Sequence, residues 1–200
     1  ESGKWAQETE RAALSEQMDA ALAAIRSAGY APRSSRIGEA YGSNTLMELL
    51  DARGVLCDST AMPGRKRVDN ERLLDWSRAS ARPYQPSRGD YQVPGEDALH
   101  LLEVPMSMAK MKTSYDKEPY LRYVDFGFRH DVLKDGLAEL LRETRLLVTI
   151  THPSTILSDI VSASHGLLSF DIDEYRRNLE FTLEQLARAR HVEIDGAERR

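Results

Sequence analysis

The chain of 200 residues contains a single cysteine, Cys57. One thiol cannot form an intramolecular disulfide, and the chain has none of the paired cysteine spacings that bind zinc. Cys57 lies in a short apolar stretch, so we expect a buried and unreactive thiol. The low cysteine content therefore excludes a disulfide-stabilised scaffold and a cysteine-based zinc module.

Long apolar runs and clustered positive charge are also missing. No stretch is long enough to span a membrane. The net charge is −5, and the one basic cluster, 65–67, is typical of a solvated loop, which argues against nucleic acid as a partner. Neither a glycine-rich phosphate loop nor a serine nucleophile elbow occurs. With 41% hydrophobic and 30% charged residues, the composition is typical of one globular domain with a real core.

Apolar periodicity predicts helices that alternate with short strands. The expected helices cover 9–28, a segment from Ser43 or Asn44 to just before Gly54, a segment from Asp131 through Leu141, and 173–190. In the last of them, the helical spacing predicts burial of Tyr175, Leu179, Leu183 and Leu186. The expected strands are 32–37, 55–58, 99–106, 146–152 and 191–194. This order predicts an α/β fold with a mostly parallel sheet or barrel, in a single domain over residues 1–200.

Candidate catalytic residues follow from the ends of the predicted parallel strands, where ligands collect in α/β folds. The rule selects Arg36, Asp58, residues 105–107 and His152. A histidine can transfer a proton, a carboxylate can orient it, and an arginine can bind an oxyanion or orient a second carboxylate. Each residue also has a structural interpretation: Asp58 as a turn cap, Arg36 as a surface residue, and His152 as a hydrogen-bonded strand-end histidine.

Residues 59–98 are rich in proline, glycine and arginine and are predicted to form a long loop insertion. Trp76, Tyr84 and Tyr91 lie in this loop, where flat rings with polar tips suit stacking on sugars. The alternative is that they pack the loop onto the rest of the domain. The remaining histidines, His100, His130, His165 and His191, show no spacing typical of a metal site and are expected to be structural.

Several segments, taken in order, resemble the polysaccharide deacetylase superfamily of NodB-like carbohydrate esterases. The resemblance covers most of residues 30–195 and rests on the order of its motifs. They are the arginine motif 31–38 with the following Tyr41-Gly42-Ser43-Asn44-Thr45, the strand Gly54 to Thr60, the strand Leu101 to Pro105, the histidine motif Thr149 to Ser154, and the closing helix with Arg177-Asn178-Leu179.

The resemblance implies a distorted (β/α) barrel and a metal-dependent hydrolase that removes acetyl groups from a carbohydrate. His152 would be the general acid, Asp58 its partner, and Arg36 would orient the catalytic base. Tyr41 would join Trp76, Tyr84 and Tyr91 in binding the substrate. The implied cofactor is a divalent metal, usually zinc, held by one aspartate and two histidines.

The superfamily's Asp-Asp strand and His-x-x-x-His motif do not occur in this chain, and the Asp-Trp that usually follows the Asp58 position is absent. We therefore expect an N-terminally truncated fragment whose metal ligands lie upstream of Glu1 and which is inactive by itself. The alternative is a deacetylase-like module that binds carbohydrate without catalysis. Oligomeric state and localisation stay open, with the cytoplasm slightly favoured.

Overall fold

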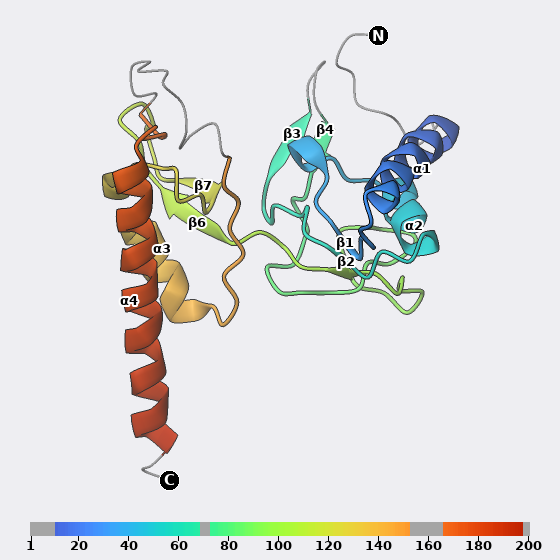
Figure 1. The fold of residues 1–200 in the computed structure, drawn as a ribbon. Helices are drawn as coiled ribbons and strands as arrows, with labels where there is room; N and C mark the ends of the chain where they lie inside the picture. The colour runs from blue at the N-terminus through green and yellow to red at the C-terminus, as the bar shows by residue number, and fades with distance from the viewer. Residues whose placement is uncertain (1–10, 69–72, 153–165, 198–200) are drawn as a thin grey trace. The chain divides into compact units, whose positions relative to one another are not determined.

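We analysed a computed structural model of the chain, in which residues 11–68, 73–152 and 166–197 are described (Figure 1). The chain divides into two compact units, Glu1–Met106 and Ser107–Arg200. No proline- or glycine-rich linker marks the division at Met106, so the sequence carried no signal of it. The architecture is mixed α/β, as the alternation of apolar patterns predicts.

Three short parallel strands form the main sheet of the first unit. They pair in the order β1 (Ser34–Ser35), β2 (Cys57–Asp58) and β5 (Leu102–Glu103). Helix α2 (Asn44–Ala52) connects β1 to β2, as a parallel pair requires. The expectation of parallel strands is thus confirmed in this unit, although each strand is shorter than its apolar run.

Two helices belong to the first unit, α1 (Arg11–Ser27) and α2. The side chain of Ser43 caps α2, because its Oγ accepts a hydrogen bond from the backbone N–H of Leu46 at 3.1 Å. Gly54, with φ of 75°, follows the end of the helix in the left-handed region that glycine tolerates best. The capping residues at both ends are therefore those that the sequence predicts.

Residues 59–98 contain more structure than the predicted loop. β3 (Lys66–Val68) and β4 (Leu73–Asp75) form an antiparallel pair. Isolated bridges also connect Tyr84 with Glu103 and Pro86 with Pro94. The segment is therefore folded onto the first unit through its own backbone pairing.

The second unit combines an antiparallel hairpin with two helices. Its elements are β6 (Met108–Met111), β7 (Tyr120–Tyr123), α3 (His130–Glu143) and α4 (Ile172–Ala197). α3 packs against β6 and α4, and buries residues that include Leu133 and Leu137. Val124, Phe126 and Phe128, from the segment that follows β7, complete this core.

Two predicted strands of the second unit are wrong. Residues 191–194 belong to α4, because the helical pattern of this segment continues past Arg190. Residues 146–152 form no strand: Leu146 is exposed and 147–150 are half-buried. Its backbone forms hydrogen bonds at separate positions, among them Val148 with Ser107 and Ile150 with Val124. None of the sheets in the described part of the chain closes into a barrel.

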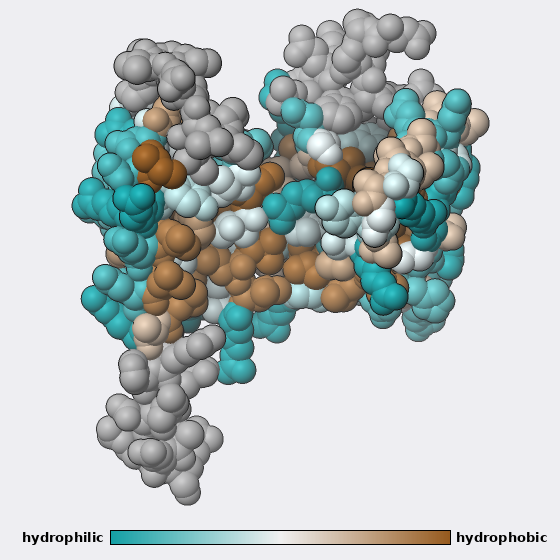
Figure 2. Space-filling view, in the orientation of Figure 1, coloured by the Kyte–Doolittle hydropathy of each residue, from teal (hydrophilic) through white to brown (hydrophobic). Residues whose placement is uncertain are grey.

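α4 leaves exposed two of the leucines that its periodicity selects, whereas Leu186 packs against the core of the second unit. Leu183 is 58% exposed and Leu179 is 36% exposed, whereas Asn178 and Thr182 are buried. Figure 2 shows hydrophobic surface, in brown, over this helix. Of the described helices, α4 included, none is both long and apolar enough to cross a membrane.

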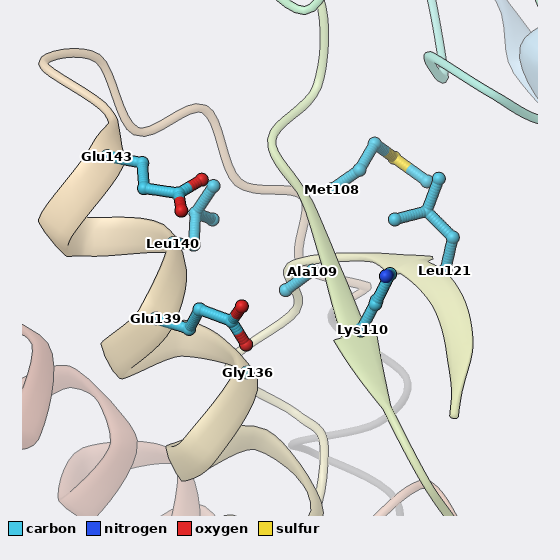
Figure 3. A pocket seen from close by; sticks show the side chains of 8 residues that line it. All are labelled: Met108, Ala109, Lys110, Leu121, Gly136, Glu139, Leu140 and Glu143. Atoms are coloured by element: carbon cyan, nitrogen blue, oxygen red, sulfur yellow. The ribbon is translucent and has the colours of Figure 1, made fainter. Parts of the chain in front are cut away.

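A glycine brings α3 close to the hairpin. A Cβ at Gly136 would collide with the backbone carbonyl oxygen of Lys110 in β6. Beside this contact lies an open groove of about 220 Å³. In Figure 3, Glu139, Leu140 and Glu143 project from α3 toward β6, and the side chains of Met108 and Lys110 lie on the side of β6 away from α3. All five residues line the groove.

We expect Gly136→Ala to destabilise the protein by about 1–3 kcal/mol, because the new methyl group meets backbone that cannot move aside. This reverses the usual stabilisation, by about 1 kcal/mol, of a glycine-to-alanine change inside a helix. Urea denaturation monitored by circular dichroism measures this change in the free energy of unfolding. Asp135→Ala, at the exposed neighbouring position of α3, is the control and should change little. Equal stability of Gly136→Ala and the wild type would contradict the tight packing.

Candidate functional site

Three polar side chains form one row across the ends of the parallel strands in the first unit. Ser35, Asp58 and Glu103 are direct register partners on β1, β2 and β5. The Oγ of Ser35 donates to Oδ1 of Asp58 at 2.5 Å. The backbone N–H of Thr60 lies 3.1 Å from both Oδ2 of Asp58 and Oε1 of Glu103. Two carboxyl groups therefore converge on a single donor.

Both carboxyl groups are fully buried. Burial, together with the charge of Asp58, raises the pKa of Glu103 to about 9. Oε1 of Glu103 also accepts from the N–H of Ala61 at 2.9 Å, but Oε2 has no hydrogen-bond partner among the described residues. The raised pKa therefore favours the protonated form of Glu103 at neutral pH.

Arg36 lies at the same edge of the sheet, directly after β1. Its Nε donates to the carbonyl oxygen of Ser59, and its Nη2 donates to Ser59 Oγ, both at 2.9 Å. The hydroxyl of Ser59 in turn donates to the carbonyl oxygen of Val104. The structure thus places both Arg36 and Asp58 at parallel strand ends, as the sequence predicts. Residues 105–106 follow β5 at this edge, and Ser107 begins the second unit.

His152 of the second unit faces a buried carboxylate. Its Nδ1 lies 3.2 Å from Oδ2 of Asp125, whose side chain has no exposed surface. Oδ1 of Asp125 accepts from the N–H of Gly127 at 2.7 Å. The ring of Tyr123 packs near the imidazole, with 6.3 Å between the ring centroids. The imidazole itself is half exposed, so Asp125 holds it from one side while part of its surface is accessible to solvent.

This geometry suits proton transfer. Burial raises the pKa of Asp125, and the hydrogen bonds from Gly127 and His152 oppose that rise. A carboxylate only accepts hydrogen bonds, so the shared proton is on Nδ1 of His152. In this tautomer Nε2 has a lone pair, so it can take up a proton to form the imidazolium and then release it, as general acid–base catalysis by a histidine requires.

The carboxylate that orients His152 is Asp125, and the sequence analysis did not select it. The resemblance implied Asp58 for this role, but Asp58 lies in the first unit, bonded to Ser35 and Thr60. A signal for Asp125 existed in the sequence, because it is a single acid between the apolar residues Val124 and Phe126. The sequence analysis did not select Glu103 as a site residue either, although a single acid inside an apolar run indicates a buried carboxyl group.

The predicted sugar-binding aromatics are largely packed inside the first unit. Trp76 and Tyr84 are buried, and Trp76 Nε1 donates to the carbonyl oxygen of Ala40 at 2.8 Å. Tyr91 packs edge-on against Trp76, and its hydroxyl donates to the carbonyl oxygen of Asp75. Tyr41 is also buried. The expectation of a stacking surface is therefore wrong for Trp76, Tyr84 and Tyr41, because buried ring faces cannot receive a sugar.

The described residues contain no group of three His, Cys, Asp or Glu side chains arranged to hold a metal. His130 is buried and bonded to Asn178, as expected for a structural histidine. His165 and the side chain of His191 lie outside the described residues. Cys57 is partly buried, and burial raises the pKa of its thiol, so it is a poor nucleophile.

Comparison with known proteins adds no relative: no protein-family model, curated protein or solved structure matches this chain. The interpretation of the site therefore rests on its geometry and chemistry.

Proposed function

We propose that this chain is part of a metal-dependent hydrolase that removes acetyl groups from a carbohydrate, with His152 as the general acid. The observation that carries the proposal is the Asp125–His152 pair, in which a fully buried carboxylate holds a half-exposed imidazole. Such a pair fixes the tautomer and the orientation of the histidine, as general acid–base catalysis by an imidazole requires.

In the proposed reaction, water adds to the acetyl carbonyl carbon and the C–N bond breaks, which releases acetate and the free amine of the sugar. His152 donates its Nε2 proton to the departing nitrogen. Asp125 accepts the Nδ1 hydrogen bond throughout and stabilises the imidazolium form that precedes the transfer. Among the described residues, His152 supplies this proton and Asp125 orients the imidazole. The proposal assigns the base that activates the water to another part of the protein.

A divalent metal would polarise the carbonyl group and lower the pKa of a bound water. The described residues do not offer a donor set for it, so the proposal assigns its ligands to other parts of the protein. The steps assigned to His152 and Asp125 do not depend on where the metal is held.

Arg36 and the parallel strands of the first unit also support this proposal. Its guanidinium group is anchored at the strand ends by Ser59 and lies on an exposed side chain. The proposal assigns to it the orientation of a second carboxylate, the role that the resemblance implies. We further propose that β1, β2 and β5 belong to a (β/α) barrel that this chain forms only in part. The alternative, a non-catalytic carbohydrate-binding module, is disfavoured because Trp76 and Tyr84 are buried.

The proposal is tested by measuring acetate release from N-acetylated oligosaccharides by the complete protein encoded at this locus, with added Zn²⁺ and with a chelator. We expect release that requires the metal. Reading the coding DNA upstream of Glu1 is the matching genetic test, and an Asp-Asp strand followed by His-x-x-x-His is the expected result. An upstream sequence without these ligands, together with no acetate release, would refute the proposal.

A further inference from the structure

α4 buries an amide side chain where its sequence pattern predicts leucines. Asn178 has no exposed surface, and Thr182, one turn further along, is 2% exposed. Burying an amide is unfavourable unless each of its polar atoms finds a partner. A helix that buries asparagine while leucines stay exposed therefore uses that amide for a specific contact.

The contacts of Asn178 all fall on one short segment. Its Nδ2 donates to the carbonyl oxygens of Phe126 at 2.9 Å and of Phe128 at 2.7 Å. Its Oδ1 lies 2.8 Å from Nδ1 of His130, which must carry the proton because an amide oxygen only accepts. Both donors and the acceptor of the amide are thus engaged with residues 126–130.

The segment held in this way begins with Asp125, the carboxylate that faces His152. A turn closes over it, since the N–H of Phe128 donates to the carbonyl oxygen of Asp125 at 3.1 Å. Within that turn the N–H of Gly127 donates to the Asp125 carboxylate. Asn178 binds the carbonyls on either side of Gly127, so it fixes the peptide planes that aim this N–H at Asp125.

We propose that Asn178 is a positioning residue that sets the tautomer of His152 through the 125–128 turn and Asp125. The chain of contacts runs from the Asn178 amide to the Phe126 and Phe128 carbonyls, through the Gly127 N–H to Asp125, and from Asp125 to His152 Nδ1. The catalytic consequence rests on the proposed function, but the effect on the His152 tautomer does not.

The test is the ¹⁵N NMR spectrum of the histidine side chains, which reports directly which ring nitrogen of His152 carries the proton. We expect a single Nδ1–H tautomer in the wild-type protein. Asn178→Leu keeps the branched shape of the side chain but removes its three hydrogen bonds, and should give a mixture of tautomers. Asp125→Asn, which removes the carboxylate directly, should abolish the Nδ1–H preference and serves as the positive control.

Thr182→Val is the matched negative control, because Thr182 is equally buried on α4 and bonds only to the helix carbonyl of Asn178 in the described contacts. It should preserve the single tautomer. Where Asn178→Leu does not fold, Asn178→Ser replaces it, since the smaller side chain leaves room for water to reach the two carbonyls. A folded Asn178 variant with an unchanged Nδ1–H tautomer would overturn the proposal.

A second readout separates this inference from the proposed function. If the complete protein releases acetate, the Asn178 variants should lower kcat by about 10- to 100-fold with little change in KM, because a displaced acid slows the proton transfer and leaves binding intact. If the wild-type protein releases no acetate, the proposed hydrolase fails, and the NMR result still decides the role of Asn178.

Discussion

Replacing His152 with alanine is expected to lower kcat/KM for acetate release by about 10²- to 10⁴-fold, the usual contribution of a positioned general acid. The amine then has to leave without a proton donor at the position that Asp125 prepares. Initial rates on an N-acetylated oligosaccharide, measured with the complete protein, check the effect. His100→Ala is the control, because His100 is an exposed histidine of the first unit and no role is assigned to its side chain.

Asp125→Asn should reproduce much of this loss without removing the imidazole. An amide at this position can donate to Nδ1, so the variant favours the tautomer with the proton on Nε2 and no longer stabilises the imidazolium form. Unchanged turnover in His152→Ala would exclude His152 as the acid. A large loss in His152→Ala with none in Asp125→Asn would limit the role of Asp125 to packing.

The second large effect concerns stability and follows from the buried carboxyl pair of the first unit. The pKa of Glu103 is raised to about 9 in the folded protein, chiefly by burial and by the charge of Asp58, whereas in the unfolded chain it stays near the ordinary value of 4.5. Between these values the folded state binds the proton and the unfolded state does not. The free energy of unfolding therefore falls as pH rises from about 5 to about 9, by up to about 1.4 kcal/mol per pH unit from this group.

Glu103→Gln should remove that slope. Glutamine resembles the protonated acid in shape: its Oε1 can accept from the N–H groups of Thr60 and Ala61, and its Nε2 can donate to the Asp58 carboxylate. We expect the variant to be more stable than the wild type above neutral pH, by a margin that grows with pH. Urea denaturation at several pH values, monitored by tryptophan fluorescence, measures this difference.

Glu96→Gln provides the matched control, because Glu96 is an exposed glutamate of the same unit. This variant should retain the pH dependence of the wild type. If Glu103→Gln loses stability with rising pH as steeply as the wild type, then Glu103 does not hold the proton of the pair.

Local sequence patterns accounted for the elements but not for their partners. The apolar run that ends at Asp58 and the cap at Ser43 are properties of neighbouring residues, and both were correctly predicted. The strand predicted over 146–152 failed for the opposite reason. Its apolar residues suggest a sheet interior, but in the described residues it forms single hydrogen bonds, such as those with Ser107 and Val124, and no strand ladder. Pairing depends on residues far along the chain, which composition does not identify.

The leucine pattern of α4 shows the same limit. Periodicity correctly predicted a helix, and it predicted burial of Leu179 and Leu183, which stay exposed. The buried stripe instead contains Asn178, because the carbonyls of Phe126 and Phe128 need donors at that position. The buried face of a helix depends on its own hydrophobicity. It also depends on which hydrogen-bonding groups of the surface packed against it need partners.

The sequence by itself determined the α/β class, the helices and the strand-end positions of Arg36 and Asp58, since these follow from short-range periodicity and turn chemistry. Only the tertiary structure decided that Glu103 shares a donor with Asp58 and that Asp125 orients His152. These residue pairs are separated by 45 and 27 positions in the chain. Their proximity results from strand register and from the 125–128 turn, so the chemistry of both sites arises from contacts that no local pattern encodes.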